Sequence, residues 1–324
     1  MDALLEVDQL CVEFTTRHGS LRALSDVSFG IAPGEVLGIV GESGAGKSLT
    51  GAVIIGLLQA PGRISSGRIV YDGQRIDTLP DDAMRRLRGR QIGSIFQDPM
   101  TALNPLLTIG HQLVETIRTH LSLSEAEAVA RAVSLLEETG ISGASQRLAQ
   151  YPHQFSGGMR QRVVIALALA AGPRLLIADE PTTALDVSVQ AQVIALLKRL
   201  CRDKGMAMML VTHDMGVIAE ACDRVAVMYA GRIVEIGPVR EVIHSPAHPY
   251  TIGLMGAIPS MSGERERLLQ IDGAMPRLGE IPEGCAFHPR CPRAWARCRS
   301  ERPELMPVSA SRAACWLHDV ESSR

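Results

Sequence analysis

Short apolar runs alternate with longer amphipathic segments along most of this chain, a pattern typical of α/β proteins. We predict strands at the short apolar runs, and helices where apolar residues recur every three or four positions. The predicted strands are 27–31, 36–40, 68–71, 175–179 and 207–212, and the predicted helices are 48–58, 125–139, 163–171 and 187–202. Alternation of this kind favours a largely parallel sheet covered by helices.

Two features modify the alternation. Between about residues 98 and 158 the signals are mostly helical, and the helix at 125–139 starts with a capping box, Ser124 followed by Glu127. Residues 224–229 and 232–236 predict a hairpin because only Ala230-Gly231 separates them. We therefore predict an α/β domain over 1–245 with a helical subdomain at about 98–158.

The chain changes character beyond about residue 246. Proline and glycine become frequent, the periodicity fades, and four of the seven cysteines lie between here and the C-terminus. We predict a short, irregular, Cys-rich extension over 246–324.

Composition narrows the class of protein. Apolar residues make up 46% of the 324 residues but aromatic residues only 3%, so we expect an aliphatic core. The net charge of −2 argues against a nucleic-acid partner. No apolar run approaches the roughly 20 residues that cross a bilayer, and the N-terminus lacks the pattern of a signal peptide. Any membrane role is expected to come through partners.

Residues 41–48 read GESGAGKS and fit the phosphate-loop pattern known as Walker A. The predicted strand 36–40 precedes them and a predicted helix follows, which is the context that this pattern requires. Glycines let the backbone curl until its N–H groups point at phosphate oxygens, and the helix start adds further N–H donors. Lys47 is expected to reach the outer phosphates and Ser48 to ligate Mg²⁺. The predicted nucleotide ligands here are Gly41, Ser43, Gly44, Ala45, Gly46, Lys47, Ser48 and Leu49.

A second candidate element for phosphate chemistry is the apolar run 175–178, which ends in Asp179 and Glu180. Asp179 is expected to hold Mg²⁺ through water, and Glu180 to orient or deprotonate the attacking water. A strand whose acidic end is simply exposed to solvent would show the same sequence pattern. The loop at 41–48 favours the functional interpretation.

These elements resemble those of the ATP-binding cassette (ABC) ATPases over about the first 240 residues. Ser156, Gly157 and Gly158 match the family's LSGGQ signature, although Phe155 replaces its leucine and Met159 its glutamine. The resemblance implies a P-loop NTPase fold. It also implies that the signature contacts ATP held by a second ATPase subunit.

Three further residues follow in the order of the family's motifs. Gln97 resembles the Q-loop glutamine, which touches Mg²⁺ and the lytic water, and His213 resembles the switch histidine near the γ-phosphate. The resemblance therefore implies Glu180, His213 and Gln97 as catalytic residues and Ser48, Gln97 and Asp179 as the Mg²⁺ ligands. Phe14 is a candidate to stack on adenine, although with Val12 it fits an alternating half-buried strand equally well.

Two stretches resemble one branch of this family, the bacterial dipeptide, oligopeptide and nickel importers. They are residues 96–105 and the run His248-Pro249-Tyr250-Thr251. The resemblance implies an ATPase subunit at the cytoplasmic face of the membrane. Its implied partners are a second ATPase subunit, typically a paralogue, two transmembrane permease subunits and an extracytoplasmic solute-binding protein. Import of nickel or glycosides is an alternative, as is a non-transport ABC ATPase acting on DNA or ribosomes.

The four C-terminal cysteines predict a metal site, because disulfides are disfavoured in the cytosol. They are Cys285, Cys291, Cys298 and Cys315. Their spacings of five, six and sixteen intervening residues are longer than is common at structural zinc sites. The segment around them resembles the tail of the peptide-importer ATPases, which implies a [4Fe–4S] cluster. Zn²⁺ and the absence of any metal are the alternatives.

Overall fold

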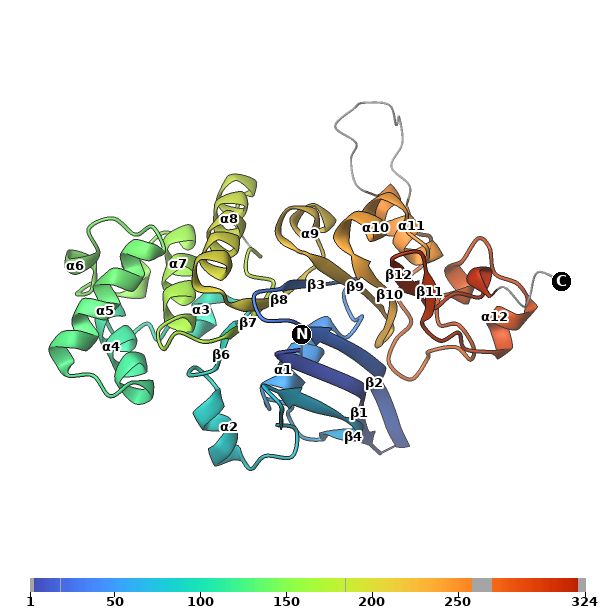
Figure 1. Ribbon diagram of the computed structural model, residues 1–324, viewed down its shortest axis with the longest axis horizontal. Coiled ribbons are helices and arrows are strands. Elements are labelled where there is room, and N and C mark those ends of the chain that lie inside the picture. The colour runs from blue at the N-terminus through green and yellow to red at the C-terminus, as the bar shows by residue number, and fades with distance from the viewer. Residues whose placement is uncertain (1–2, 18, 184, 258–269, 320–324) are drawn as a thin grey trace. The chain divides into compact units, whose positions relative to one another are not determined.

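The computed structural model describes residues 3–17, 19–183, 185–257 and 270–319 (Figure 1). The chain folds into two compact units, each assembled from separate segments. Unit 1 comprises Met1–Leu4, Ile31–Glu35 and Thr78–Val211, and unit 2 comprises Leu5–Gly30, Val36–Asp77 and Thr212–Arg324. Both units combine helices with a β-sheet, so the α/β class predicted from the alternation is confirmed.

Three parallel strands form the sheet of unit 1. They are β6 (Ile92–Ile95), β7 (Leu175–Asp179) and β8 (Ala207–Thr212), with β7 between the other two. Leu175 to Ala178 and the whole of β8 are buried. A parallel strand covered on both faces needs this uninterrupted apolar run, which explains why β7 and β8 have the predicted bounds.

Helices make up most of the rest of unit 1. They are α2 (Asp81–Leu87), α3 (Pro99–Ala102), α4 (Ile109–His120), α5 (Glu125–Glu138), α6 (Ala144–Arg147), the 3₁₀ turn η1 (Pro152–Gln154), α7 (Gly157–Ala168) and α8 (Val187–Lys204). Helices α4, α5 and α7 pack on one another through aliphatic side chains such as Leu113, Leu136 and Val163, all fully buried. The capping box predicted at α5 is confirmed, since the Ser124 Oγ accepts the Glu127 N–H and Glu127 accepts the Ser124 N–H at 2.8 Å.

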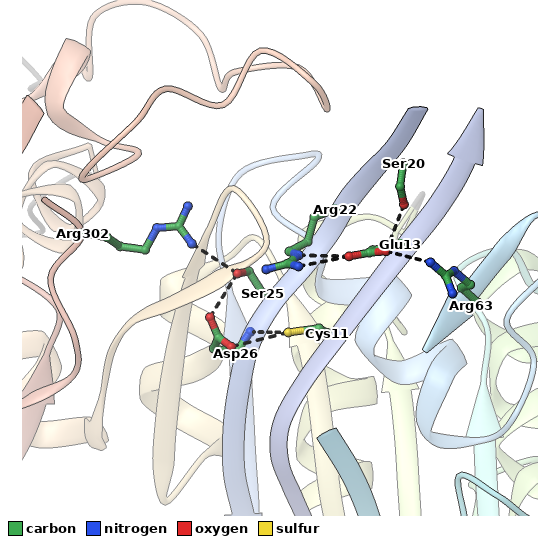
Figure 2. Close-up of polar contacts among 8 residues, drawn as sticks. All are labelled: Cys11, Glu13, Ser20, Arg22, Ser25, Asp26, Arg63 and Arg302. Carbon is green, nitrogen blue, oxygen red and sulfur yellow. Dashed lines mark hydrogen bonds and ion pairs between the residues drawn. The ribbon is translucent and has the colours of Figure 1, made fainter. Parts of the chain in front are cut away.

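Unit 2 contains an antiparallel sheet in the order β2-β1-β4-β5. The strands are β1 (Leu5–Thr16), β2 (Gly19–Ile31), β4 (Gly62–Tyr71) and β5 (Gln74–Arg75). Figure 2 shows Glu13 on this sheet accepting hydrogen bonds from Ser20, Arg22 and Arg63. The sequence prediction recovered only parts of β2 and β4, and of β1 only the alternation at Val12 and Phe14, because polar residues interrupt the apolar positions of these strands.

The second sheet of unit 2 begins with β3 (Val36–Val40), which is parallel to β9 (Arg224–Tyr229). The predicted hairpin is confirmed, with β9 antiparallel to β10 (Arg232–Pro238). The short strands β12 (Ser311–Ala313) and β11 (Met306–Val308) extend the same sheet from β10. The helical elements of unit 2 are α1 (Lys47–Ile54), α9 (Met215–Ala221), α10 (Val239–His244), α11 (Pro249–Gly256), η2 (His288–Arg290), α12 (Ala296–Ser300) and η3 (Trp316–His318).

Aromatic side chains join the C-terminal segment to the strands of unit 2. The rings of Tyr229, Tyr250 and Phe287 contact one another with centroids 4.8 to 5.4 Å apart, and all three are buried. Burial also lowers the pKa of His248 to about 3, so its ring is neutral and Nδ1 accepts the Tyr250 N–H that starts α11. The fully buried carboxylate of Glu235 accepts the N–H groups of Ala247 and His248.

Among the described residues, no helix combines the length and the apolar character needed to cross a membrane.

Replacing Ser124 by Ala is expected to weaken the first turn of α5. The change removes the acceptor for the Glu127 N–H and should lower the free energy of opening of this turn by about 1 kcal/mol. Hydrogen exchange of the amides at 125–128 measures it. Ser134→Ala makes the same change inside α5 and should not accelerate exchange there, because alanine favours the helix interior. Equal acceleration in both variants would contradict the capping role.

Candidate active site

The phosphate loop connects β3 to α1 within unit 2. Gly46 precedes α1 in the left-handed conformation, with φ of 101°, which side chains with a Cβ rarely adopt. Gly41 lies so close to β9 that an added Cβ would be 2.3 Å from the Met228 carbonyl oxygen. Ser43, Gly44 and Ser48 are exposed, whereas Gly41, Ala45 and Lys47 are buried and Leu49 is half-buried. The predicted strand–loop–helix context is therefore present.

Lys47 folds back onto the loop that precedes it. Its side chain is largely buried, and Nζ donates to the carbonyl oxygens of Gly41 at 2.8 Å and Glu42 at 3.0 Å. These contacts hold a cation within a loop whose helix end supplies N–H donors. The combination suits a phosphate group.

Asp179 and Glu180 occupy the carboxyl end of β7 in unit 1, and both are half-buried. Glu180 has a positive φ of 44°, which is uncommon for a residue with a side chain. Its N–H donates to the Val211 carbonyl at 2.9 Å, which holds the turn against β8.

The structure brings Gln97 and Glu180 into direct contact. Gln97 follows β6, and its Nε2 donates to the Glu180 Oε2 at 3.0 Å. Thr183 Oγ1 donates to the same oxygen at 2.8 Å. The sequence prediction missed Thr183, although a hydroxyl three residues after the acidic pair is within reach of that carboxylate. Two donors on one oxygen fix the orientation of the Glu180 carboxylate.

Ser156, Gly157 and Gly158 begin helix α7, also in unit 1. Ser156 is the N-cap and accepts the Met159 N–H, while Ser156 and Gly157 are exposed. An added Cβ on Gly158 would lie 2.8 Å from a methyl group of Val189. Phe155, which departs from the family pattern, is buried with the Arg147 guanidinium over its ring. The departure thus affects packing beneath the helix start.

His213 and Phe14 both belong to unit 2. His213 follows β8 and is exposed, immediately before Asp214, which caps α9 by accepting the Gly216 N–H at 2.7 Å. Phe14 is half-buried near the end of β1, opposite Gly62 of β4. An added Cβ on Gly62 would lie 2.9 Å from the Phe14 ring, so the ring packs on the strand. Stacking of adenine on one face of the Phe14 ring stays a prediction.

The prediction of a [4Fe–4S] cluster at the four C-terminal cysteines is wrong, and the zinc alternative fails with it. Among residues 3–17, 19–183, 185–257 and 270–319, no group of three or more His, Cys, Asp or Glu side chains is placed to hold a metal ion. The cysteines are free thiols that line one small pocket. Apolar residues such as Phe287 and Trp316 line the same pocket, as do His248, His288 and Arg293. Burial raises the pKa of Cys285, Cys291 and Cys315, the last to about 11.

Two family models match the chain. Residues 24–183 match the model described as ABC transporter, and residues 234–298 match the model described as oligopeptide/dipeptide transporter, C-terminal region. The first match includes the phosphate loop, Gln97, the signature and the acidic end of β7. The second includes His248, Tyr250 and three of the four C-terminal cysteines.

Curated relatives match over nearly the whole chain. The oligopeptide transport ATP-binding protein OppD of Escherichia coli is 50% identical over 99% of this chain and 94% of its own length. The dipeptide transport ATP-binding protein DppD of the same species is 46% identical over 96% of this chain and 95% of its own. The oligopeptide transport ATP-binding protein AppD of Bacillus subtilis is 45% identical over 100% of this chain and 99% of its own.

Solved structures agree on the fold. The ATP-binding cassette MJ0796, in a dimeric post-hydrolysis state bound to ADP and phosphate, has a TM-score of 0.65 at 29% identity. The alignment covers 73% of this chain and 99% of that one. The cbiO1 protein of Clostridium perfringens, part of the ABC transporter complex cbiONQ, has the same TM-score at 31% identity, with 76% and 92% covered. The chain belongs to the ABC transporter family, in the group formed by the oligopeptide and dipeptide transport ATP-binding proteins.

Proposed function

We propose that this chain is the ATP-hydrolysing subunit that powers import of dipeptides or oligopeptides through a membrane ABC transporter. The observation that carries the proposal is the identity of 50% to an oligopeptide transport ATP-binding protein over 99% of the chain. The match of residues 234–298 to the oligopeptide/dipeptide model supports a peptide over nickel or a glycoside. It also favours transport over action on DNA or ribosomes.

The phosphate loop binds the triphosphate of ATP in this proposal. Its residues Gly41 and Ser43 to Leu49 supply N–H donors, and Lys47 turns from the carbonyls of Gly41 and Glu42 to the outer phosphates. Phe14 packs against the adenine. Ser48, Asp179 and Gln97 offer hydroxyl, carboxylate and amide oxygens, which are the donors that Mg²⁺ prefers. Bound there, Mg²⁺ would neutralise charge on the phosphates.

Hydrolysis depends on the carboxylate of Glu180. Gln97 and Thr183 hold one of its oxygens and so orient the group toward a water that attacks the γ-phosphate. His213 steadies the γ-phosphate by hydrogen bonding. These roles need no proton transfer beyond the one from water to Glu180.

A second ATPase subunit completes each site. The helix start at Ser156, Gly157 and Gly158 presents a hydroxyl and N–H groups that would meet the γ-phosphate of ATP bound to that subunit. We propose a paralogue as the second subunit, two permease subunits, and a solute-binding protein outside the cell. The chain then lies peripherally at the cytoplasmic face of the membrane. We also propose the division into a nucleotide-binding domain over 1–245, with its helical subdomain at about 98–158, and an extension over 246–324.

Replacing Lys47 by Ala is expected to weaken ATP binding about 10- to 100-fold, because the phosphates lose a charged donor. Isothermal titration of the purified full chain with Mg·ATP measures the dissociation constant. Lys198→Ala removes a lysine from the exposed face of α8 and serves as the control. Unchanged affinity in Lys47→Ala would refute the assignment of the loop.

Glu180→Gln is expected to bind ATP as the wild type does and to hydrolyse it at least about 100-fold more slowly, since an amide cannot accept the proton of water. ATP should then trap two subunits together, which size-exclusion chromatography detects. The matched variant Glu137→Gln changes an exposed carboxylate on α5 and should hydrolyse normally. Near-normal turnover by Glu180→Gln in the assembled transporter would count against the role.

The peptide assignment is tested in the assembled transporter, reconstituted with its permeases and solute-binding protein. ATP hydrolysis should rise when dipeptides or oligopeptides are added with the binding protein. Nickel, glycosides, DNA and ribosomes should have no such effect. Stimulation by one of these alone would overturn the proposal.

A further inference from the structure

One carboxylate of the phosphate loop is held by a residue far along the chain. The Arg290 guanidinium donates to both oxygens of Glu42, at 2.9 and 3.1 Å. The Arg290 side chain is 7% exposed and the Glu42 side chain 29% exposed, so the pair is partly shielded from water. A bidentate, shielded pair fixes geometry more firmly than a surface ion pair.

Arg290 is itself held in place by several groups of unit 2. Its Nε donates to the Asp272 carbonyl at 2.9 Å, and its guanidinium lies 5.8 Å from the Tyr229 ring centroid and 5.9 Å from that of Phe287. The aromatic rings favour a cation at this position. The orientation of Arg290 therefore does not depend on Glu42 alone.

The backbone of Glu42 is held as well. Its N–H donates to the Tyr250 Oη at 2.9 Å, and its carbonyl accepts from Lys47. Tyr250 is fully buried. Both Tyr250 and Arg290 lie in the segment that matches the oligopeptide/dipeptide model.

A carboxylate in this loop opposes the function of the loop. Loops that bind phosphate by N–H groups and a lysine also bind other anions. An unpaired Glu42 would repel the triphosphate and could accept the donors meant for it. Arg290 offsets this charge and donates a hydrogen bond to each of the two carboxylate oxygens.

We infer that Arg290 is a positioning residue for nucleotide binding, which acts through Glu42 to keep the phosphate loop open to a triphosphate. The inference rests on the proposed binding of ATP by this loop. The C-terminal segment would then contribute to nucleotide binding, in addition to packing on the strands of unit 2.

The test is the dissociation constant for Mg·ATP of the purified full chain in four forms: wild type, Arg290→Gln, Glu42→Gln and the double variant. Arg290→Gln should weaken binding about three- to tenfold in the presence of Glu42. In the Glu42→Gln background the same change should have less than about a twofold effect, because no carboxylate is left to neutralise.

Two further variants separate positioning from folding. Arg290→Lys keeps the charge but not the paired hydrogen bonds and should recover part of the affinity lost in Arg290→Gln. Arg297→Gln breaks ion pairs with Glu301 and Asp319 in the same C-terminal segment and should leave ATP affinity unchanged. Thermal unfolding of every variant shows which ones fold. If Arg290→Gln does not fold, the comparison of Arg290→Lys with wild type in both Glu42 backgrounds carries the test.

The outcomes distinguish this inference from the proposed function. Failure of the wild type to bind Mg·ATP would refute the proposed function. If the wild type binds Mg·ATP and Arg290→Gln binds it with equal affinity, the proposed function stands and only the role of Arg290 is refuted. An equal loss with and without the Glu42 carboxylate would show that Arg290 acts by another route, and a loss in Arg297→Gln would show a general effect of the C-terminal segment.

Discussion

The burial of short aliphatic strands on both faces is the constraint on which the candidate site depends. In unit 1 the backbone of β7 pairs on both sides, and its side chains from Leu175 to Ala178 are fully enclosed. Polar side chains are excluded from such a strand, so they occur where it ends. Asp179 and Glu180 follow directly, and Gln97 follows β6. In unit 2 the phosphate loop follows β3 for the same reason.

Around these strand ends the backbone is bent into conformations that carry a cost. Glu180 has a positive φ, and Gly41 and Gly46 occupy positions where a Cβ would collide with neighbouring atoms. Local hydrogen bonds offset this cost, such as that from the Glu180 N–H to Val211. Strained turns of this kind keep reactive side chains in fixed orientations before substrate arrives.

The C-terminal segment shows how resemblance and structure can diverge. The cysteine spacing and the likeness to importer tails predicted a metal cluster, yet the described residues contain no such group. The same segment instead supplies Tyr250 and Phe287 to the core of unit 2 and Arg290 to the phosphate loop. The packing of Tyr250 and Phe287 on Tyr229 of β9 attaches this segment to unit 2, because each ring buries a large apolar area.

The sequence by itself determined the α/β class, the strands β3, β7 and β8, the hairpin of β9 and β10, and the capping box of α5. It also determined the family, because the phosphate loop and the signature are contiguous motifs whose chemistry depends on neighbouring residues. Strands β11 and β12 were not predicted, since each has only three residues and β12 pairs with β10, which is distant in sequence. In β1 only the alternation at Val12 and Phe14 was recognised, since the strand is completed by pairing with the distant β4.

Contacts between distant residues were decided only by the tertiary structure. Gln97 meets Glu180 across 83 residues, and Arg290 meets Glu42 across 248. No local pattern marks Arg290 as a partner of the phosphate loop. The sequence around an exposed arginine does not differ from that around a buried arginine that donates two hydrogen bonds to one carboxylate. Such pairs depend on how the chain folds back on itself, which the order of residues along a single segment does not encode.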